Sequence, residues 1–161
     1  LKAAEAEAFV WYEALLDGPG GEVLRPDEGE RPARAAHLHA LLGAYDPGLA
    51  RRLAANGLAA MPSARLCDAL FTRAGLALTD CARIWDALLS DPRRFEFCGH
   101  VTVAVLVLRR REILTGDMDK GALAEAVLAS ASAVPAEQAL RVARAVCAFE
   151  RYNAGASARA N

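Results

Sequence analysis

The amino-acid sequence predicts an all-α domain of about eight helices, built around one central buried helix. Apolar residues recur at helical spacing along most of the chain, and no stretch keeps a clear strand period. The run Val101–Leu108 is almost entirely apolar, so neighbouring helices must cover it on every side. This run has some strand-like character, but the arginines that follow it and its helical neighbours favour a helix.

Length and composition indicate one globular domain that can bury a core. Of the 161 residues, 54% are hydrophobic and 24% are charged, which excludes a disordered chain. The net charge is −1 and the basic residues are spread along the sequence, so no nucleic-acid partner is expected. No apolar run approaches the ~20 residues of a membrane span, and no signal peptide opens the chain. We therefore expect a cytoplasmic protein.

Turn and capping residues divide the first half of the chain into helices. Residues 3–17 are predicted to be helical, and a glycine-rich polar loop follows them. A second helix is predicted over residues 31–44. Asp46 is a suitable N-cap for a third helix, because Pro47 follows it at the first helical position. Asn56-Gly57 is expected to end that helix.

Two further helices are predicted in the middle of the chain. The first spans residues 62–72, and four of its apolar residues are expected to face the core: Leu66, Ala69, Leu70 and Phe71. Thr79 is expected to cap the second. Asp91 ends it, because the residue before a proline disfavours the helical conformation.

The last half holds the central helix and two more. The central helix is predicted from about residue 95 to residue 114. Gly116 stops it, and Asp117 is expected to cap the next helix. A final helix begins at Pro135, and its core side is formed by Leu140, Ala143, Val146 and Cys147. The small, polar residues 153–161 are predicted to form a frayed tail, which leaves residues 1–152 as the domain.

The spacing of histidines and cysteines offers no metal site, and no cofactor is expected. His37 and His39 stand two apart on a predicted helix and therefore point to nearly opposite faces. The cysteines form no C-x-x-C pair and lie among apolar residues, which favours buried free thiols over disulfides or zinc. These cysteines are Cys67, Cys81, Cys98 and Cys147. Nucleophile and phosphate-loop motifs are absent, so no catalytic residue is predicted.

One block of the sequence resembles a known family. It reads R-I-W-D, then D-P-R-R-F-E-F, then an apolar helix that closes on Gly-Asp. This pattern is similar to the C-terminal half of a TBC domain, the catalytic domain of GTPase-activating proteins for Rab GTPases. Weaker matches lie upstream in the family's order, at Glu5–Leu15 and Asp46–Gly57. The residues that carry the main match are Arg83, Trp85, Asp86, Asp91, Phe95, Phe97, Gly116 and Asp117.

The resemblance implies a lobe that supports catalysis without supplying the catalytic side chains. TBC domains insert an arginine from I-x-x-D-x-x-R and a glutamine from Y-x-Q into the Rab nucleotide site. Neither motif occurs in this chain. In the family both precede the segment that resembles Glu5–Leu15, so we expect an upstream catalytic half as a partner. The chain would then activate a GTP-bound Rab in membrane traffic, at endomembranes or the cilium, and would not itself be an enzyme.

The resemblance also implies two protein-contact surfaces. Arg65 and Arg73 are the residues that it places toward a Rab, although Leu66 stands where the family often has tryptophan. Half of a domain should also expose a sizeable apolar face that the N-terminal half covers. Two alternatives remain open. One is a catalytically silent TBC module that binds a Rab or another protein, and the other is a helical scaffold unrelated to GTPases.

Trp85 is expected to be a core anchor, because large aromatic residues on the apolar face of a helix usually serve packing. Arg83 and Asp86 should then satisfy buried or half-buried polar groups beside it. On this placement Trp85→Ala costs about 3–5 kcal/mol of stability. An unchanged melting temperature would contradict the placement.

Overall fold

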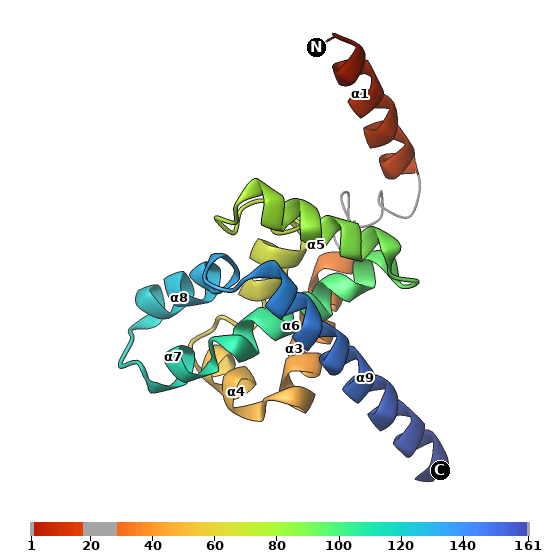
Figure 1. Ribbon diagram of the computed structural model, residues 1–161. Coiled ribbons are helices and arrows are strands. Elements are labelled where there is room, and N and C mark those ends of the chain that lie inside the picture. Colours follow the sequence, from red (N-terminus) through yellow and green to blue (C-terminus); the bar gives the residue numbers. More distant parts are fainter. Residues whose placement is uncertain (1, 18–28, 161) are drawn as a thin grey trace.

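Helices form every regular element in the parts of the chain that the computed structural model describes, residues 2–17 and 29–160. The predicted all-α class is therefore confirmed (Figure 1). These ranges contain eight α-helices, a π-helical turn η1 and a 3-10 turn η2. In chain order they are α1 Lys2–Asp17, α3 Glu30–Tyr45, α4 Pro47–Ala55, η1 Ser63–Cys67, α5 Leu78–Ser90, η2 Arg94–Glu96, α6 Phe97–Leu108, α7 Arg110–Thr115, α8 Lys120–Ser132 and α9 Ala136–Ala160. The loop predicted after α1 lies outside the described residues.

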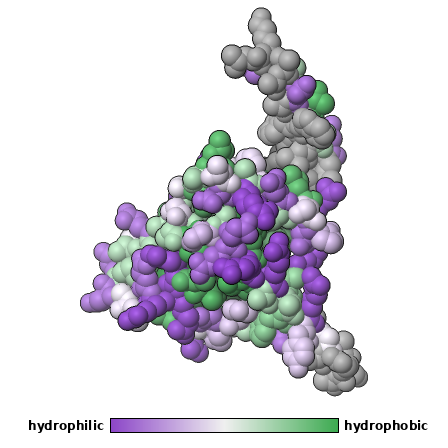
Figure 2. All heavy atoms as spheres, viewed as in Figure 1, coloured by the Kyte–Doolittle hydropathy of each residue, from purple (hydrophilic) through white to green (hydrophobic). Residues whose placement is uncertain are grey.

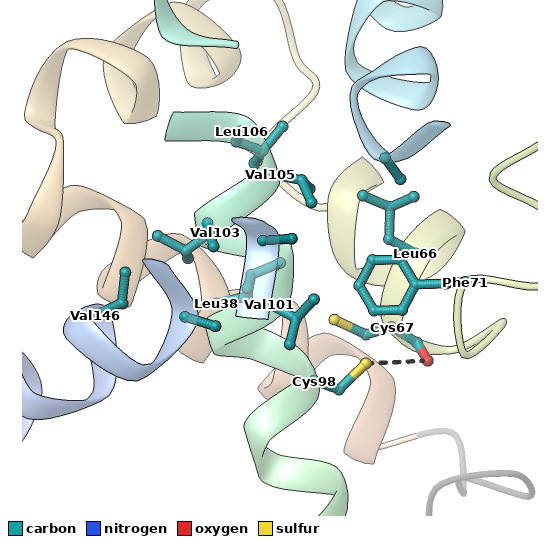
Figure 3. Packing of buried hydrophobic residues seen from close by; sticks show 14 of the residues in the cluster. Leu38, Leu66, Cys67, Phe71, Cys98, Val101, Val103, Val105, Leu106 and Val146 are labelled. Atoms are coloured by element: carbon teal, nitrogen blue, oxygen red, sulfur yellow. Dashed lines mark hydrogen bonds between the residues drawn. The ribbon is translucent and has the colours of Figure 1, made fainter. Parts of the chain in front are cut away.

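Helix α6 is the central helix that its apolar sequence predicts. Every residue from Val101 to Leu106 is buried. The helix packs against α9, α8, α3 and η1, which lie on different sides of it. Figure 3 shows its side chains leaving in several directions, toward Leu38 of α3, Val146 of α9 and Leu66 of η1. Because α6 has no polar face, the neighbouring helices cover it on every side.

The predicted helix over residues 95–114 is divided in the structure. The first residues form the 3-10 turn η2, and the chain then breaks again at Arg109, between α6 and α7. Arg109 pairs with Glu112, and the Nε of Arg110 lies 2.5 Å from Asp46 Oδ2. Two of the three consecutive arginines of residues 109–111 are thus held in ion pairs. The prediction of one continuous helix was wrong, because periodicity did not mark the break.

Asp46 is the N-cap of α4, as predicted. Its Oδ1 accepts hydrogen bonds from the N–H groups of Gly48 and Leu49, each at 3.1 Å. The same buried carboxylate binds Arg110 of α7. One side chain therefore starts a helix and also joins two helices that are distant in sequence.

Two predicted caps were wrong. Helix α5 begins at Leu78 with Ala77 before it, so Thr79 lies inside the first turn. Gly116 ends α7 as predicted, but Asp117 is exposed and caps nothing. The cap of α8 is Asp119, whose Oδ1 accepts a hydrogen bond from Ala122 N–H at 2.8 Å. Each error moves the predicted start of a helix by only a few residues, because several neighbouring residues can serve as its cap.

The segment predicted as a helix over residues 62–72 is mostly the π-helical turn η1 followed by tight turns. Leu70 and Phe71 have φ angles of 45° and 62°, in the left-handed region that ordinary side chains disfavour by about 1–2 kcal/mol per residue. Both side chains are nevertheless buried. Burying a large apolar side chain contributes about 1.5–3 kcal/mol, which offsets this cost.

Helix α9 extends further than the sequence predicted. Its core side carries Leu140, Ala143, Val146 and Cys147, all buried as expected. The helix then continues to Ala160, through most of the segment that was expected to be a frayed tail. Small residues such as alanine have high helix propensity, so a lack of large apolar residues does not by itself end a helix.

Leu106→Ala tests the central position of α6. The side chain is fully buried, so its truncation should destabilise the fold by about 2–5 kcal/mol. Leu78→Ala is the matched control, because Leu78 is 80% exposed and its truncation should change stability by about 0.5 kcal/mol or less. Chemical denaturation measures both. Equal effects would contradict the placement of α6.

Arg94→Gly tests the backbone of the link before α6. Arg94 is exposed and has a φ of 48°, which glycine adopts without steric cost. The variant should therefore be more stable by roughly 0.5–1 kcal/mol. Arg144→Gly, in the interior of α9, should instead lose about 1 kcal/mol. Thermal melts that move in the same direction for both variants would refute this backbone assignment.

Candidate functional site

An open groove lies between the start of α3, the turns around η1, and α5. Its volume is about 850 Å³, within the ~300–1,000 Å³ usual for binding sites. On the face drawn in Figure 2, the surface over α5 is largely hydrophilic, with a few apolar atoms at its upper edge. The lining is mainly apolar and includes Ala35, Ala64, Leu70, Leu88, Leu89 and Phe95.

Trp85 lies at this groove, and the prediction that it anchors the core was wrong. Its side chain is 37% exposed, and its Nε1–H donates a hydrogen bond to the carbonyl oxygen of Leu70 at 2.9 Å. Ile84 and Leu88 occupy the core face of α5 instead. Trp85 sits at the edge of that face, so its ring reaches the turns after η1 and not the core.

Arg83 and Asp86 are exposed and do not satisfy buried groups, contrary to expectation. Arg83 forms an ion pair with Glu137 at the start of α9. Within residues 2–17 and 29–160, no ion pair is found for Asp86. Arg83 precedes Trp85 by two positions and Asp86 follows it by one, and both lie on the solvent side of α5. The R-I-W-D motif therefore contributes one core residue, Ile84, and one groove residue, Trp85.

The remaining residues of the TBC-like block are mainly structural. Asp91 ends α5 with an extended backbone, and its Oδ1 accepts a hydrogen bond from Arg93 N–H at 2.9 Å. Phe95 is buried and lines the groove. Phe97 is buried at the start of α6, where its ring stacks on that of His100. The short link from Asp91 to Phe97 thus connects the wall of the groove to the central helix α6.

Of the two arginines expected to face a partner, one lies at the groove. Arg73 is exposed and lines it, together with Arg31 from the start of α3. Neither arginine has an ion-pair partner in the described part of the chain. Arg65 is exposed on η1 but is not part of the lining. The groove therefore combines apolar walls with two available positive charges.

A second cavity, of about 520 Å³, contains a polar cluster that sequence analysis missed. Glu150 of α9 lies 2.8 Å from His100 Nε2, and Arg93 and His37 approach it at 3.8 and 3.9 Å. The cluster joins α3, α6 and α9. The one signal in the sequence was that Glu150 follows Val146 by four positions, on the core side of the last helix.

The cysteines are free and buried, as predicted. Cys67 and Cys98 face each other at the second cavity, and Cys67 Sγ lies 3.0 Å from Thr102 Oγ1. Hydrogen bonding from Cys98 lowers the pKa of the Cys67 thiol. The same contact, together with burial, raises the pKa of Cys98. Burial also raises the pKa of Cys81.

Comparisons with protein-family models, with curated proteins and with solved structures find no match for this chain. Among residues 2–17 and 29–160, no helix combines the length and the apolar character needed to cross a membrane. Within the same ranges, no group of three or more histidine, cysteine, aspartate or glutamate side chains is arranged to hold a metal ion. The open apolar groove is the best-defined candidate site that the described residues offer.

The position of Trp85 at the groove changes the expected cost of its removal. Trp85→Ala should destabilise the fold by about 1–2 kcal/mol, because it removes one hydrogen bond and only part of the ring is buried. Trp85→Phe keeps the aromatic ring and should lose about 1 kcal/mol or less. Denaturation curves measure both variants. A loss of the size expected for a core tryptophan would overturn the groove placement.

Proposed function

We propose that this chain is the C-terminal lobe of a TBC-type Rab GTPase-activating domain, and that it contributes a protein-binding surface. The observation that carries this proposal is the composition of the groove. Trp85 and Phe95, from the TBC-like block, line it together with Arg73, which the resemblance places toward a Rab. Residues that are far apart in the sequence thus share one open surface.

The groove has the chemistry of a protein-binding surface. Tryptophan and arginine are the residues most often found at interface hot spots, where an apolar pocket accepts a side chain from the partner. Here a half-exposed tryptophan and an exposed Leu89 border an apolar floor, and Arg31 and Arg73 stand at the side. Depletion of lysine and glutamate at the centre of an interface is also typical. The lining contains neither of these residues.

In this proposal the chemistry of GTP hydrolysis is completed by other parts of the assembly. Phosphoryl transfer depends on positioning and on stabilising charge at the transferred group. An arginine and a glutamine from the upstream catalytic half would supply these effects in the Rab site. The present lobe would hold the Rab and support that half. Its own contribution is then binding energy and orientation.

A second candidate is a module that binds a Rab, or another protein, without accelerating hydrolysis. This chain itself contains neither I-x-x-D-x-x-R nor Y-x-Q, so what it supplies alone is a binding surface. The two candidates share the groove and differ only in what lies upstream. They therefore make the same prediction for the binding of a Rab and different predictions for the rate of GTP hydrolysis.

Binding to a panel of Rab proteins, each loaded with a non-hydrolysable GTP analogue or with GDP, tests the shared part. We expect at least one GTP-form Rab to bind, with the affinity reduced about tenfold or more by Trp85→Ala or Arg73→Glu. Arg144→Glu is the charge-matched control, because Arg144 is exposed on α9 and does not line the groove. Equal losses in all three variants would refute a role for the groove.

Hydrolysis rates then separate the two candidates. The intact source protein should accelerate GTP hydrolysis by the bound Rab if it supplies the catalytic arginine and glutamine. Binding without acceleration would favour the silent module. No binding to any Rab, by this chain or by the source protein, would overturn the Rab GTPase-activating proposal and leave the second candidate only with another protein as its partner.

A further inference from the structure

Helix α1 stands apart from the other helices and carries exposed apolar residues. Figure 1 draws it away from the helical body, and the α1 residues whose side chains are described, such as Phe9 and Glu13, do not line the groove. Phe9 and Val10 are 60% and 62% exposed. Most helices in proteins gain their stability by packing an apolar face against the rest of the molecule. Helix α1 therefore needs a surface to pack against.

The chemistry of α1 is acidic and apolar. It contains four acidic residues and a single basic one, Lys2. Glu5, Phe9 and Glu13 follow one another at intervals of four, so they lie along one face of the helix. By the same geometry Val10 and Asp17 lie beside that face. On this side of the helix Phe9 and Val10 therefore stand among carboxylates.

The groove has the complementary chemistry. Its walls are apolar, and its charged lining consists of Arg31, Arg73 and Asp68. Asp68 lies 3.7 Å from Arg34, which offsets its charge. Arg31 and Arg73 have no such partner among the described residues. An acidic helix with a protruding phenylalanine matches this surface in both polarity and charge.

We propose that α1 of one copy of this chain occupies the groove of a second copy, and that the exchange is reciprocal. Figure 1 draws α1 away from the helical body, so a second copy can reach it without refolding of that body. Reciprocal exchange uses the same two surfaces twice, which closes the assembly as a symmetric dimer. The dimer would bury Phe9 and Val10 of both copies. This inference does not depend on Rab binding, because it is measured on the chain alone.

Light scattering coupled to size-exclusion chromatography tests the dimer over a range of concentrations. We expect the wild-type chain to have twice the mass of a single copy. Phe9→Glu combined with Val10→Glu, or Arg31→Glu combined with Arg73→Glu, should give a monomer. The altered residues are exposed, so circular dichroism should show an intact fold. Glu125→Arg and Arg144→Glu, at exposed positions outside α1 and the groove, should leave the dimer unchanged.

Charge reversal on both surfaces identifies the contact. Glu5→Arg with Glu13→Arg should give a monomer, and so should the groove variant Arg31→Glu with Arg73→Glu. Combining all four substitutions in one chain should restore the dimer, because the reversed charges again attract. A wild-type monomer at every concentration would overturn the proposal. So would a dimer that ignores these substitutions, or a monomer whose α1 is protected from hydrogen exchange by its own groove.

Discussion

The burial of α6 on all sides is the constraint on which the rest of the fold depends. A helix with Val101, Val103, Val105 and Leu106 directed outward has no polar face, so each side requires its own cover. Helices α3, α8 and α9 and the turn η1 provide it from different directions. The short helices that surround α6 cross one another at an angle. Side chains therefore fill the space at the ends of these helices less well than the space along their sides. The arrangement thus favours a dense centre and irregular edges.

The groove is a consequence of how one of these edges is covered. The segment after η1 turns sharply so that Phe71 reaches the core, and it adopts the left-handed conformation to do so. The same tight turns carry Leu70, which lines the groove next to Trp85. Core packing and the candidate site are therefore linked through the same few residues. If a second copy and a Rab both use this surface, the two associations are mutually exclusive, and self-association would set the fraction of chain available to a partner.

Local signals in the sequence predicted much of the fold. The Asp46-Pro47 start of α4, the end of α5 at Asp91 and the core side of α9 follow from capping, proline geometry and helical spacing, which act within a few residues. The role of Trp85 did not follow, because spacing alone does not say which residue of a broad apolar face lies at its edge. The cluster of His100 and Glu150 was also missed, since it joins positions fifty residues apart. The irregular turn at Leu70 depends on core contacts that compete with local preference.

Asp46 shows how strongly a single position can restrict the residues that fit it. Its Oδ1 satisfies two backbone N–H groups while its Oδ2 binds Arg110 of α7. Asparagine would keep the short side chain that a cap requires but would lose the negative charge, and glutamate would keep the charge on a chain too long to cap. Neither of its nearest chemical relatives performs both tasks. In a family of related sequences this position should therefore tolerate less substitution than the fully buried leucines around it, whose role several apolar residues can fill.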